Sequence, residues 1–347
     1  MELYKETCNK ITGLDKEVME EAQKRLDYLL KPQGSLGKLE EIAKQLAGIT
    51  GKINNDVTKR VIVAMCGDNG IYEEGVASYP QEVSTLVAET MCNGLSGVAV
   101  LSRHAGAKMH VVDLGLKGEV KDNKIINRKI RNEGTGNFAK GPAMTKDEAV
   151  KAIEIGIEET NKLIDEGYQL AGTGEVGIAN TTTSSAILYA FTGESLDLLV
   201  GRGAGLSDEG LTKKKEVIKK GVELNKPDVN DPVDVLAKVG GFDIAGLVGV
   251  YLASAARKIP VVIDGFISGV AAVIAYKISP LSAEYMIPSH ITDEPGGKII
   301  SEILGKESML NMHMRLGEGT GCALAFHIIE AAARMMNEMG TFGDIGM

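Results

Sequence analysis

Short apolar runs that end in glycine and polar residues alternate along the chain with longer segments of helical periodicity. The run RVIVAMCGDNG at 60–70 places consecutive apolar residues directly before a polar turn. Such a run is typical of a parallel strand that is buried on both faces. Similar runs predict further strands at 107–115, 168–177, 196–205, 259–266 and 283–290.

Apolar residues recur at helical spacing in the intervals between these runs. The predicted helices are 81–104, 146–166, 180–192, 207–224, 233–257, 266–279 and 319–339. This repeated alternation of strands and helices predicts an α/β fold with a mostly parallel sheet flanked by helices. Before the first strand, one helix over 15–31 stops at Pro32 and a second begins after Ser35 as its N-cap, which indicates an N-terminal helical unit.

Glycine-rich loops follow most of the predicted strands. In α/β sheets, ligands bind beyond the carboxyl ends of the strands, so these loops are expected to surround one site. Any single loop of this kind is often an ordinary turn, but five on one side favour a binding site. They are GDNG, GTGEVG, GRGAG, DGFISG and SHITDEPGG. The segment 117–144 is expected to be a long exposed connection, such as a flap or a subunit contact.

Composition narrows the class of protein. The chain has 347 residues, enough for one large domain or a large and a small one, and 42 glycines. A net charge of −9 argues against a general nucleic-acid-binding surface. The four cysteines and five histidines show no metal-ligand spacing, so neither a built-in metal nor a disulfide framework is expected. We also expect no membrane span and no signal peptide.

The loop GTGEVGIANTTTSSA at 172–186 suits an anion, because glycines and small hydroxyl residues before a helix leave backbone N–H groups free. Asn180, Thr181 and Thr182 also fit plain helix capping. Glu175 within the turn does not suit a pure anion site. A carboxylate here indicates recognition of a hydroxyl group or of a developing positive charge.

The loop GRGAGLSDEGLTKKKEVI at 201–218 places Arg202 between glycines, with three lysines one to two turns into the next helix. Arg and Lys beside a glycine loop can hold phosphate or carboxylate. A lysine run on a helix is more often a solvated face. We therefore expect no more than one of Lys213, Lys214 and Lys215 to reach a site.

In SHITDEPGGKII at 289–300, Ser289 and the glycine amides could hold a phosphate, while His290 is more readily explained as a hydrogen-bonded structural residue. The chain lacks a P-loop motif and a nucleophile elbow, and GRGAGL is an incomplete dinucleotide fingerprint. In RLGEGTGCALA at 315–325, Glu318 lies between two glycines at a helix start. It either complements the helix dipole or is a reactive group that a ligand must approach closely.

Taken together, these motifs resemble those of the nicotinate-nucleotide–dimethylbenzimidazole phosphoribosyltransferase family. The matching segments are KPQGSLGKLE, GDNGIYEEGVASYPQEVS, GEVGIANTTTSSA, GRGAGLSDEGLTKK, DVLAKVGGFDIAGLVG, PVVIDGFISGVAA, SHITDEPG and RLGEGTGCALA. Their order and spacing cover nearly the whole chain from about residue 20, which is more specific than any single motif.

The resemblance implies an enzyme that moves the 5-phosphoribosyl group of nicotinate mononucleotide to a nitrogen of 5,6-dimethylbenzimidazole or a related base. The products are nicotinate and α-ribazole 5′-phosphate, which is used for the lower ligand of cobamides such as cobalamin. It also implies a cytoplasmic dimer without a cofactor, a Rossmann-like sheet in a large domain at 56–318, and a small helical domain from 1–55 and 319–347.

The resemblance also implies roles for individual residues. Glu318 matches the catalytic base, which takes the proton of the acceptor ring; a helix N-terminus is expected to keep it ionised at some loss of basicity. Glu175 would stabilise positive charge on the ribose, and Lys214 matches the motif lysine. The residues expected to hold phosphate, ribose or nicotinate are Gly174, Gly177, Asn180, Gly203, Asp264, Ser289 and Arg315. Those expected around the acceptor base are Ser78, Tyr79 and Val87.

Two positions depart from the family pattern. Family members usually carry His where this chain has Asn69, and some carry Gln at Val87. These changes are expected to alter the accepted base, and another azole, a purine or a phenol is an alternative acceptor. Other hypotheses are one subunit of a heterodimer with a paralogue, with or without activity of its own, and, less favoured, a nucleotide-dependent oxidoreductase.

Overall fold

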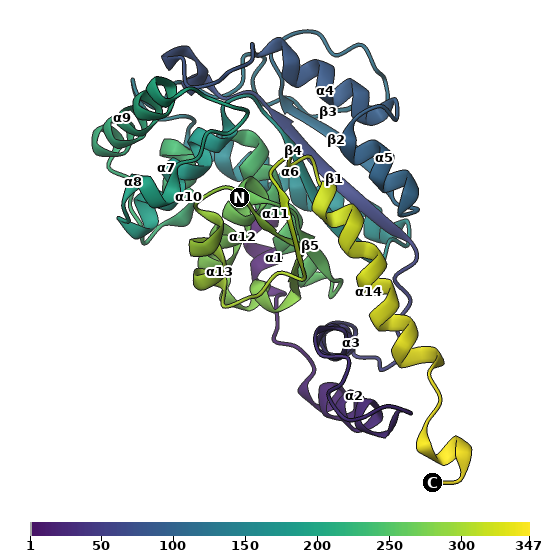
Figure 1. The fold of residues 1–347 in the computed structure, drawn as a ribbon. Coiled ribbons are helices and arrows are strands. Elements are labelled where there is room, and N and C mark those ends of the chain that lie inside the picture. The colour runs from purple at the N-terminus through teal and green to yellow at the C-terminus, as the bar shows by residue number, and fades with distance from the viewer. Residues whose placement is uncertain (1) are drawn as a thin grey trace.

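A computed structural model describes residues 2–347. Its main element is a six-stranded parallel sheet with the order β3-β2-β1-β4-β5-β6 (Figure 1). The strands are β1 (Arg60–Gly67), β2 (Lys108–Gly115), β3 (Ile126–Asn127), β4 (Leu170–Val176), β5 (Val261–Ile263) and β6 (Met286–Pro288). The order reverses between β1 and β4, and in such sheets the crevice at the reversal point holds the ligand.

The sheet is buried on both faces, as its continuous apolar strands predict. In β1, Val61, Val63 and Met65 join one core, and Ile62, Ala64 and Cys66 join the other. On the first face, α11 (Phe242–Ala256) and α12 (Phe266–Ile278) contact the strands, with α6 (Lys146–Asp165) behind α11. On the second face lie α4 (Glu82–Cys92), α5 (Gly97–His104) and α14 (Thr320–Glu338) (Figure 1). This arrangement confirms the predicted α/β class.

The remaining helices connect these layers or lie beside them. They are α7 (Asn180–Thr192), α8 (Leu196–Leu199), α9 (Asp208–Asn225), α10 (Pro232–Val239), α13 (Gly297–Leu304), η1 (Gly70–Glu74), η2 (Pro280–Tyr285) and η3 (Phe342–Ile345). A separate two-stranded sheet pairs β7 (His290–Thr292) with β8 (Leu310–Met314).

The chain ends contribute helices outside the sheet layers. α2 (Lys16–Tyr28) and α3 (Lys38–Thr50) pack together, and α3 also contacts α14, which extends away from the sheet toward them (Figure 1). By contrast, α1 (Glu2–Asn9) contacts α6 and α11. The division into 1–55 plus 319–347 and 56–318 stays a prediction.

Some predicted elements were wrong in detail. The segment 196–205 is not a strand, because Ser195 caps the short helix α8 and Leu198 is exposed, whereas β4 pairs directly with β5. The predicted helix 233–257 breaks at Gly240 and Gly241 into α10 and α11. The N-cap of α3 is Gly37 rather than Ser35. The segment 117–144 includes the edge strand β3, and Phe138 within it is buried.

The predicted helix 81–104 is also two helices. Glu82–His104 is long and apolar enough, by length and composition alone, to cross a membrane, which is weak evidence for a span. Within it the chain breaks between α4 and α5, where Ser96 accepts a hydrogen bond from the Ala99 amide as the N-cap of α5. Both helices contact β2, so in this structure the segment packs against the sheet.

Candidate active site

A cavity of about 610 Å³ opens at the carboxyl edge of the sheet, beside the reversal between β1 and β4. Its walls come from the segments 79–87, 175–181, 203–204, 265–267, 290–294 and 315–318. Four of the five glycine-rich loops therefore converge as predicted. The loop GDNG does not line the cavity, because Asp68 and Asn69 are buried beneath it.

Glu318 lies on a turn in which three consecutive residues have left-handed backbone. The φ angles are 82° at Gly317, 65° at Glu318 and 103° at Gly319. A Cβ on Gly317 would collide with the Glu175 carboxylate, and one on Gly174 would collide with the Glu318 carbonyl. The bare backbone around Glu318 thus lets the turn lie directly against β4, and the Glu318 amide donates to Glu175 Oε1 at 3.3 Å.

The Glu318 side chain lines the cavity and reaches the start of α5. Its Oε2 accepts a hydrogen bond from the Val98 amide at 3.3 Å. Burial raises the pKa of Glu318, while the Val98 amide and the Ser96 hydroxyl lower it. The expected loss of basicity is therefore wrong in direction, because partial burial outweighs the helix-terminus effect, and the helix that contacts the carboxylate is α5 rather than α14.

Glu175, at the end of β4, belongs to a cluster of buried carboxylates. Asn180 Nδ2 donates both to Glu175 Oε2 at 2.5 Å and to Asp243 Oδ2 at 2.9 Å. Burial, with the charge of Asp243 next, raises the pKa of Glu175 well above its usual range, and burial raises the pKa of Asp243 to about 7. Among residues 2–347, no Lys or Arg forms an ion pair with either carboxylate. In its ionised form the cluster can stabilise a positive charge that a ligand brings, because an opposite charge nearby favours the ionised carboxylates.

Asp264 follows β5 and supports the Glu318 turn. Its two oxygens accept hydrogen bonds from the Gly319 amide at 3.0 Å and from the Gly321 amide at 2.6 Å. Burial raises the pKa of Asp264 to about 7, although these amides lower it. The Ser289 hydroxyl is fully buried and donates to the Asp264 carbonyl at 3.0 Å. Contacts of Asp264 with ribose and of Ser289 with phosphate stay predictions.

Of the three consecutive lysines at 213–215 in α9, Lys214 is the buried one. Its Nζ donates to Thr181 Oγ1 at 2.8 Å and to the Gly201 carbonyl at 3.0 Å, and burial lowers its pKa to about 8. Lys213 is exposed, and Lys215 pairs with Asp197 at 2.5 Å. Lys214 therefore lies directly behind Thr181 and Gly203, which line the cavity.

Arg315 and the predicted acceptor residues lie at the cavity rim. Arg315 Nη1 donates to the Gly203 carbonyl at 3.3 Å. Tyr79 and Val87 line the same cavity as Glu318, whereas Ser78 lines a small adjoining pocket of about 90 Å³. Apolar groups and the Glu318 carboxylate therefore line the same cavity.

Asn69 is buried and connects the end of β1 with the loop after β4. Its side chain donates to the Gly67 and Ile178 carbonyls at 3.3 and 3.5 Å and accepts a hydrogen bond from Thr183 at 3.1 Å. Asn69 does not line the cavity, and the expectation that it alters the accepted base stays a prediction.

The sequence did not single out Asp243, the start of α5, or Glu294 as site residues. Asp243 and Glu294 lie in the motifs GGFD and TDEPGG, which are visible in the sequence. Their approach to Asn180 and to the Gly201–Gly203 turn depends on how distant segments pack, which local spacing does not report.

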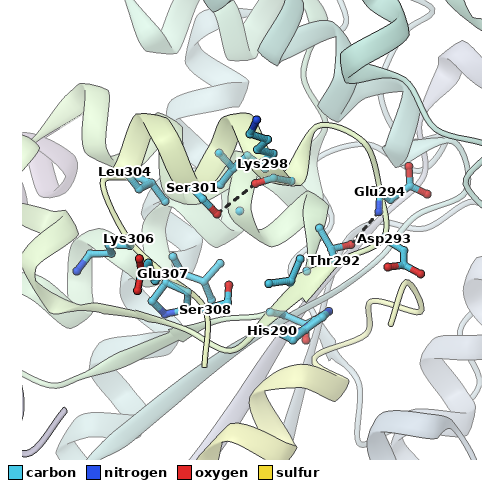
Figure 2. Close-up of a pocket in the computed structure, with 18 of the residues that line it drawn as sticks. His290, Thr292, Asp293, Glu294, Lys298, Ser301, Leu304, Lys306, Glu307 and Ser308 are labelled. Atoms are coloured by element: carbon cyan, nitrogen blue, oxygen red, sulfur yellow. Dashed lines mark hydrogen bonds between the residues drawn. The ribbon is translucent and has the colours of Figure 1, made fainter. Parts of the chain in front are cut away.

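A second cavity of about 720 Å³ adjoins the first and shares Gly265, His290, Thr292 and Glu294 with it. Figure 2 shows His290 and Thr292 on one side of it, with Lys298 and Ser301 of α13 on another. This cavity is larger, but neither Glu318 nor Glu175 lines it. The chemistry of the carboxylates therefore places the candidate active site in the smaller cavity.

Comparison with known proteins agrees with this arrangement. The family model described as phosphoribosyltransferase matches residues 11–347. The nicotinate-nucleotide–dimethylbenzimidazole phosphoribosyltransferase of Ruminiclostridium cellulolyticum is 54% identical over 98% of this chain and 97% of its own, and that of Clostridium tetani is 50% identical over 99% and 95%.

A solved structure, that of CobT from Thermus thermophilus, is 35% identical with a TM-score of 0.91 over 95% of this chain and 99% of its own. Together, the matched family, the near-full-length relatives and the shared fold lead to one conclusion: the chain belongs to the nicotinate-nucleotide–dimethylbenzimidazole phosphoribosyltransferase family.

Proposed function

We propose that this chain transfers the 5-phosphoribosyl group of nicotinate mononucleotide to a ring nitrogen of 5,6-dimethylbenzimidazole or a related base, releasing nicotinate. The observation that carries the proposal is the pair Glu318 and Glu175, which line one cavity and are joined by the Glu318 amide at 3.3 Å. The phosphoribosyltransferase relatives match nearly the full length of the chain.

The donor brings a positive charge to the site. Its pyridinium ring leaves as a neutral base, while positive charge builds on the ribose, as in glycoside cleavage. When they are ionised, the buried carboxylates around Asn180 supply negative potential there, and Glu175 lines the cavity wall. We assign to Glu175 the stabilisation of that charge, which is an electrostatic contribution to the transition state.

The acceptor base has to lose a proton as it attacks the sugar. Glu318 lies in the same cavity as Tyr79 and Val87, where an aromatic ring can lie against apolar groups. Its raised pKa makes it a stronger base than an exposed glutamate. We assign the proton transfer to Glu318, phosphate contacts to Lys214 and the loops at Gly177 and Gly203, and the nicotinate carboxylate to Arg315.

The pH dependence of turnover follows from the charge state of Glu318. Its pKa in the folded protein lies above the usual 4.5, and only the ionised form accepts a proton. We expect kcat/KM to fall about tenfold per pH unit on the acid side, with a midpoint above 4.5. A series of initial rates from pH 4.5 to 8 measures this limb. The residual activity of Glu318→Gln should lack it, and a limb of the same midpoint in that variant would contradict the assignment.

A product analysis tests the function directly. The purified chain is incubated with nicotinate mononucleotide and a panel of azoles, purines and phenols, and nicotinate and the new nucleotide are quantified by chromatography with mass spectrometry. We expect both products in equal amounts with at least one benzimidazole. Release of nicotinate only after addition of a second protein would instead support the heterodimer hypothesis. No release under either condition contradicts the proposed reaction.

The assembly and location of the chain remain parts of this proposal. We propose a cytoplasmic homodimer that acts on these two small molecules. A heterodimer with a paralogue is the alternative. Size measurement of the purified chain by light scattering distinguishes a dimer of identical chains from a monomer that needs a partner.

A further inference from the structure

Glu294 is a buried carboxylate that the proposed mechanism does not use. It lies in the loop between β7 and α13, is 7% exposed, and lines both the active-site cavity and the adjoining one. Its Oε2 is buried without a hydrogen-bond partner in the described part of the chain. A Cβ on Gly201 would collide with that oxygen, so the carboxylate lies directly against the Gly201 backbone.

The turn that Glu294 contacts is held by two cationic side chains. Lys214 Nζ donates to the Gly201 carbonyl at 3.0 Å, and Arg315 Nη1 donates to the Gly203 carbonyl at 3.3 Å. The turn therefore presents Gly203 to the cavity with one cation behind it and one at its rim. Glu294 is the acidic group near both of them: burial raises the pKa of Glu294, and the charges of Lys214 and then Arg315 counteract that rise.

We propose that Glu294 is a positioning residue that holds Lys214 and the Gly201–Gly203 turn ready for the 5′-phosphate of the nucleotide donor. This inference rests on the proposed function, because it assumes a donor with a terminal phosphate. Glu294 acts through Lys214 and the turn. A buried ammonium loses its charge readily unless an acidic group is near, and a neutral lysine attracts phosphate weakly.

Several charged groups on and around α9 have other partners or directions. Lys215 pairs with Asp197 of α8, and Lys213 extends toward Gly75. On α10, Asp234 pairs with Lys238. Arg202, in the same turn, pairs with Asp208, and α7 faces Lys214 with the Thr181 hydroxyl. Glu294 is thus the carboxylate that counteracts the burial of Lys214, whose pKa lies at about 8.

Glu294→Gln tests the proposal through the pH dependence of donor binding. The variant keeps the shape of the side chain and removes its charge, so Lys214 should lose its proton at lower pH. We expect the KM for nicotinate mononucleotide to match the wild type at pH 6 and to rise roughly 2- to 5-fold above it at pH 8, the effect of a decrease of about 0.5–1 unit in the Lys214 pKa. We expect kcat to change less than about twofold.

Controls separate this role from simple structural support. In a Lys214→Met background, Glu294→Gln should add no further pH-dependent change, because the group it acts on is gone. Nicotinate riboside, which lacks the phosphate, should bind wild type and Glu294→Gln equally at both pH values. Glu302→Gln removes an exposed carboxylate of α13 and should leave the KM unchanged.

Two outcomes overturn the proposal. One is a KM for Glu294→Gln that is raised by the same factor at pH 6 and pH 8, which indicates structural support alone. The other is a KM profile identical to that of the wild type. Calorimetric binding of nicotinate mononucleotide at the two pH values gives the same readout without turnover. Failure of the wild type to transfer the ribosyl group is therefore distinguishable from failure of this inference.

Discussion

Glu318→Gln is expected to lower kcat by roughly 10²- to 10⁴-fold, the usual contribution of a general base. The amide cannot take up the acceptor proton, but its oxygen can still accept the hydrogen bond from the Val98 amide, which is long at 3.3 Å. We therefore expect nearly unchanged thermal stability and donor KM. Steady-state kinetics with saturating donor and acceptor, together with thermal unfolding, measure both effects.

The matched control is Glu338→Gln, at the other end of α14. Glu338 is exposed and pairs with Arg334 at 3.7 Å, far along the helix from the cavity. This variant should keep wild-type turnover. A folded Glu318→Gln protein with turnover within a few-fold of the wild type would remove Glu318 from the catalytic role.

The effect should be large because the site gathers buried carboxylates that have no paired cationic side chain. Glu175, Asp243 and Asp264 are buried near one another, and in residues 2–347 no Lys or Arg pairs with them. Such an arrangement is unfavourable for the resting protein. It becomes favourable when a pyridinium donor binds and the ribose gains positive charge, which fits the differential stabilisation that catalysis requires.

The central fold was predictable because its signals are local. The run at 60–67 carries apolar side chains on both faces of the strand. A parallel strand with helices on both sides of the sheet buries both faces, so the sequence predicts this arrangement. The same rule failed for the segment 196–205, because a short apolar run also fits a short helix, which this segment forms at Leu196–Leu199. The strand β3 has two residues and carries no periodic signal.

The site could be predicted where a single motif contains both a reactive side chain and the residues that its backbone conformation requires. Glu318 between two glycines marks a left-handed turn, and Glu175 is the charged residue near the end of a strand, in β4 rather than in the turn that was expected. The partners of these residues were not predictable. Val98 lies 220 residues before Glu318, and Asp243 lies 63 residues after Asn180. Contacts over such separations are decided by the packing of whole helices on the sheet.

Asp264→Asn should show how strongly catalysis depends on that packing. At pH 8, above the pKa of about 7, the ionised carboxylate accepts the Gly319 and Gly321 amides, and an asparagine offers only one acceptor oxygen for the two. An unsatisfied buried amide costs about 1–3 kcal/mol in the free energy of unfolding. Because the Glu318 turn shifts with these amides, we expect kcat to fall roughly 10²-fold, the effect of a misplacement of about 1 Å.

Asp113→Asn provides the comparison for this change. Asp113 lies near the end of β2 and is equally buried. It accepts the Gly115 and Leu116 amides with Oδ1 at 3.0 and 2.8 Å and pairs through Oδ2 with Lys129 at 3.5 Å, and none of these groups belongs to the Glu318 turn. We expect the loss of this ion pair to lower the unfolding free energy, and we expect kcat to stay unchanged at a temperature where both variants are folded. Equal losses of kcat in the two variants would mean that general destabilisation, rather than the position of the Glu318 turn, limits turnover. A loss confined to Asp264→Asn links the buried carboxylate to the proton transfer through two backbone amides.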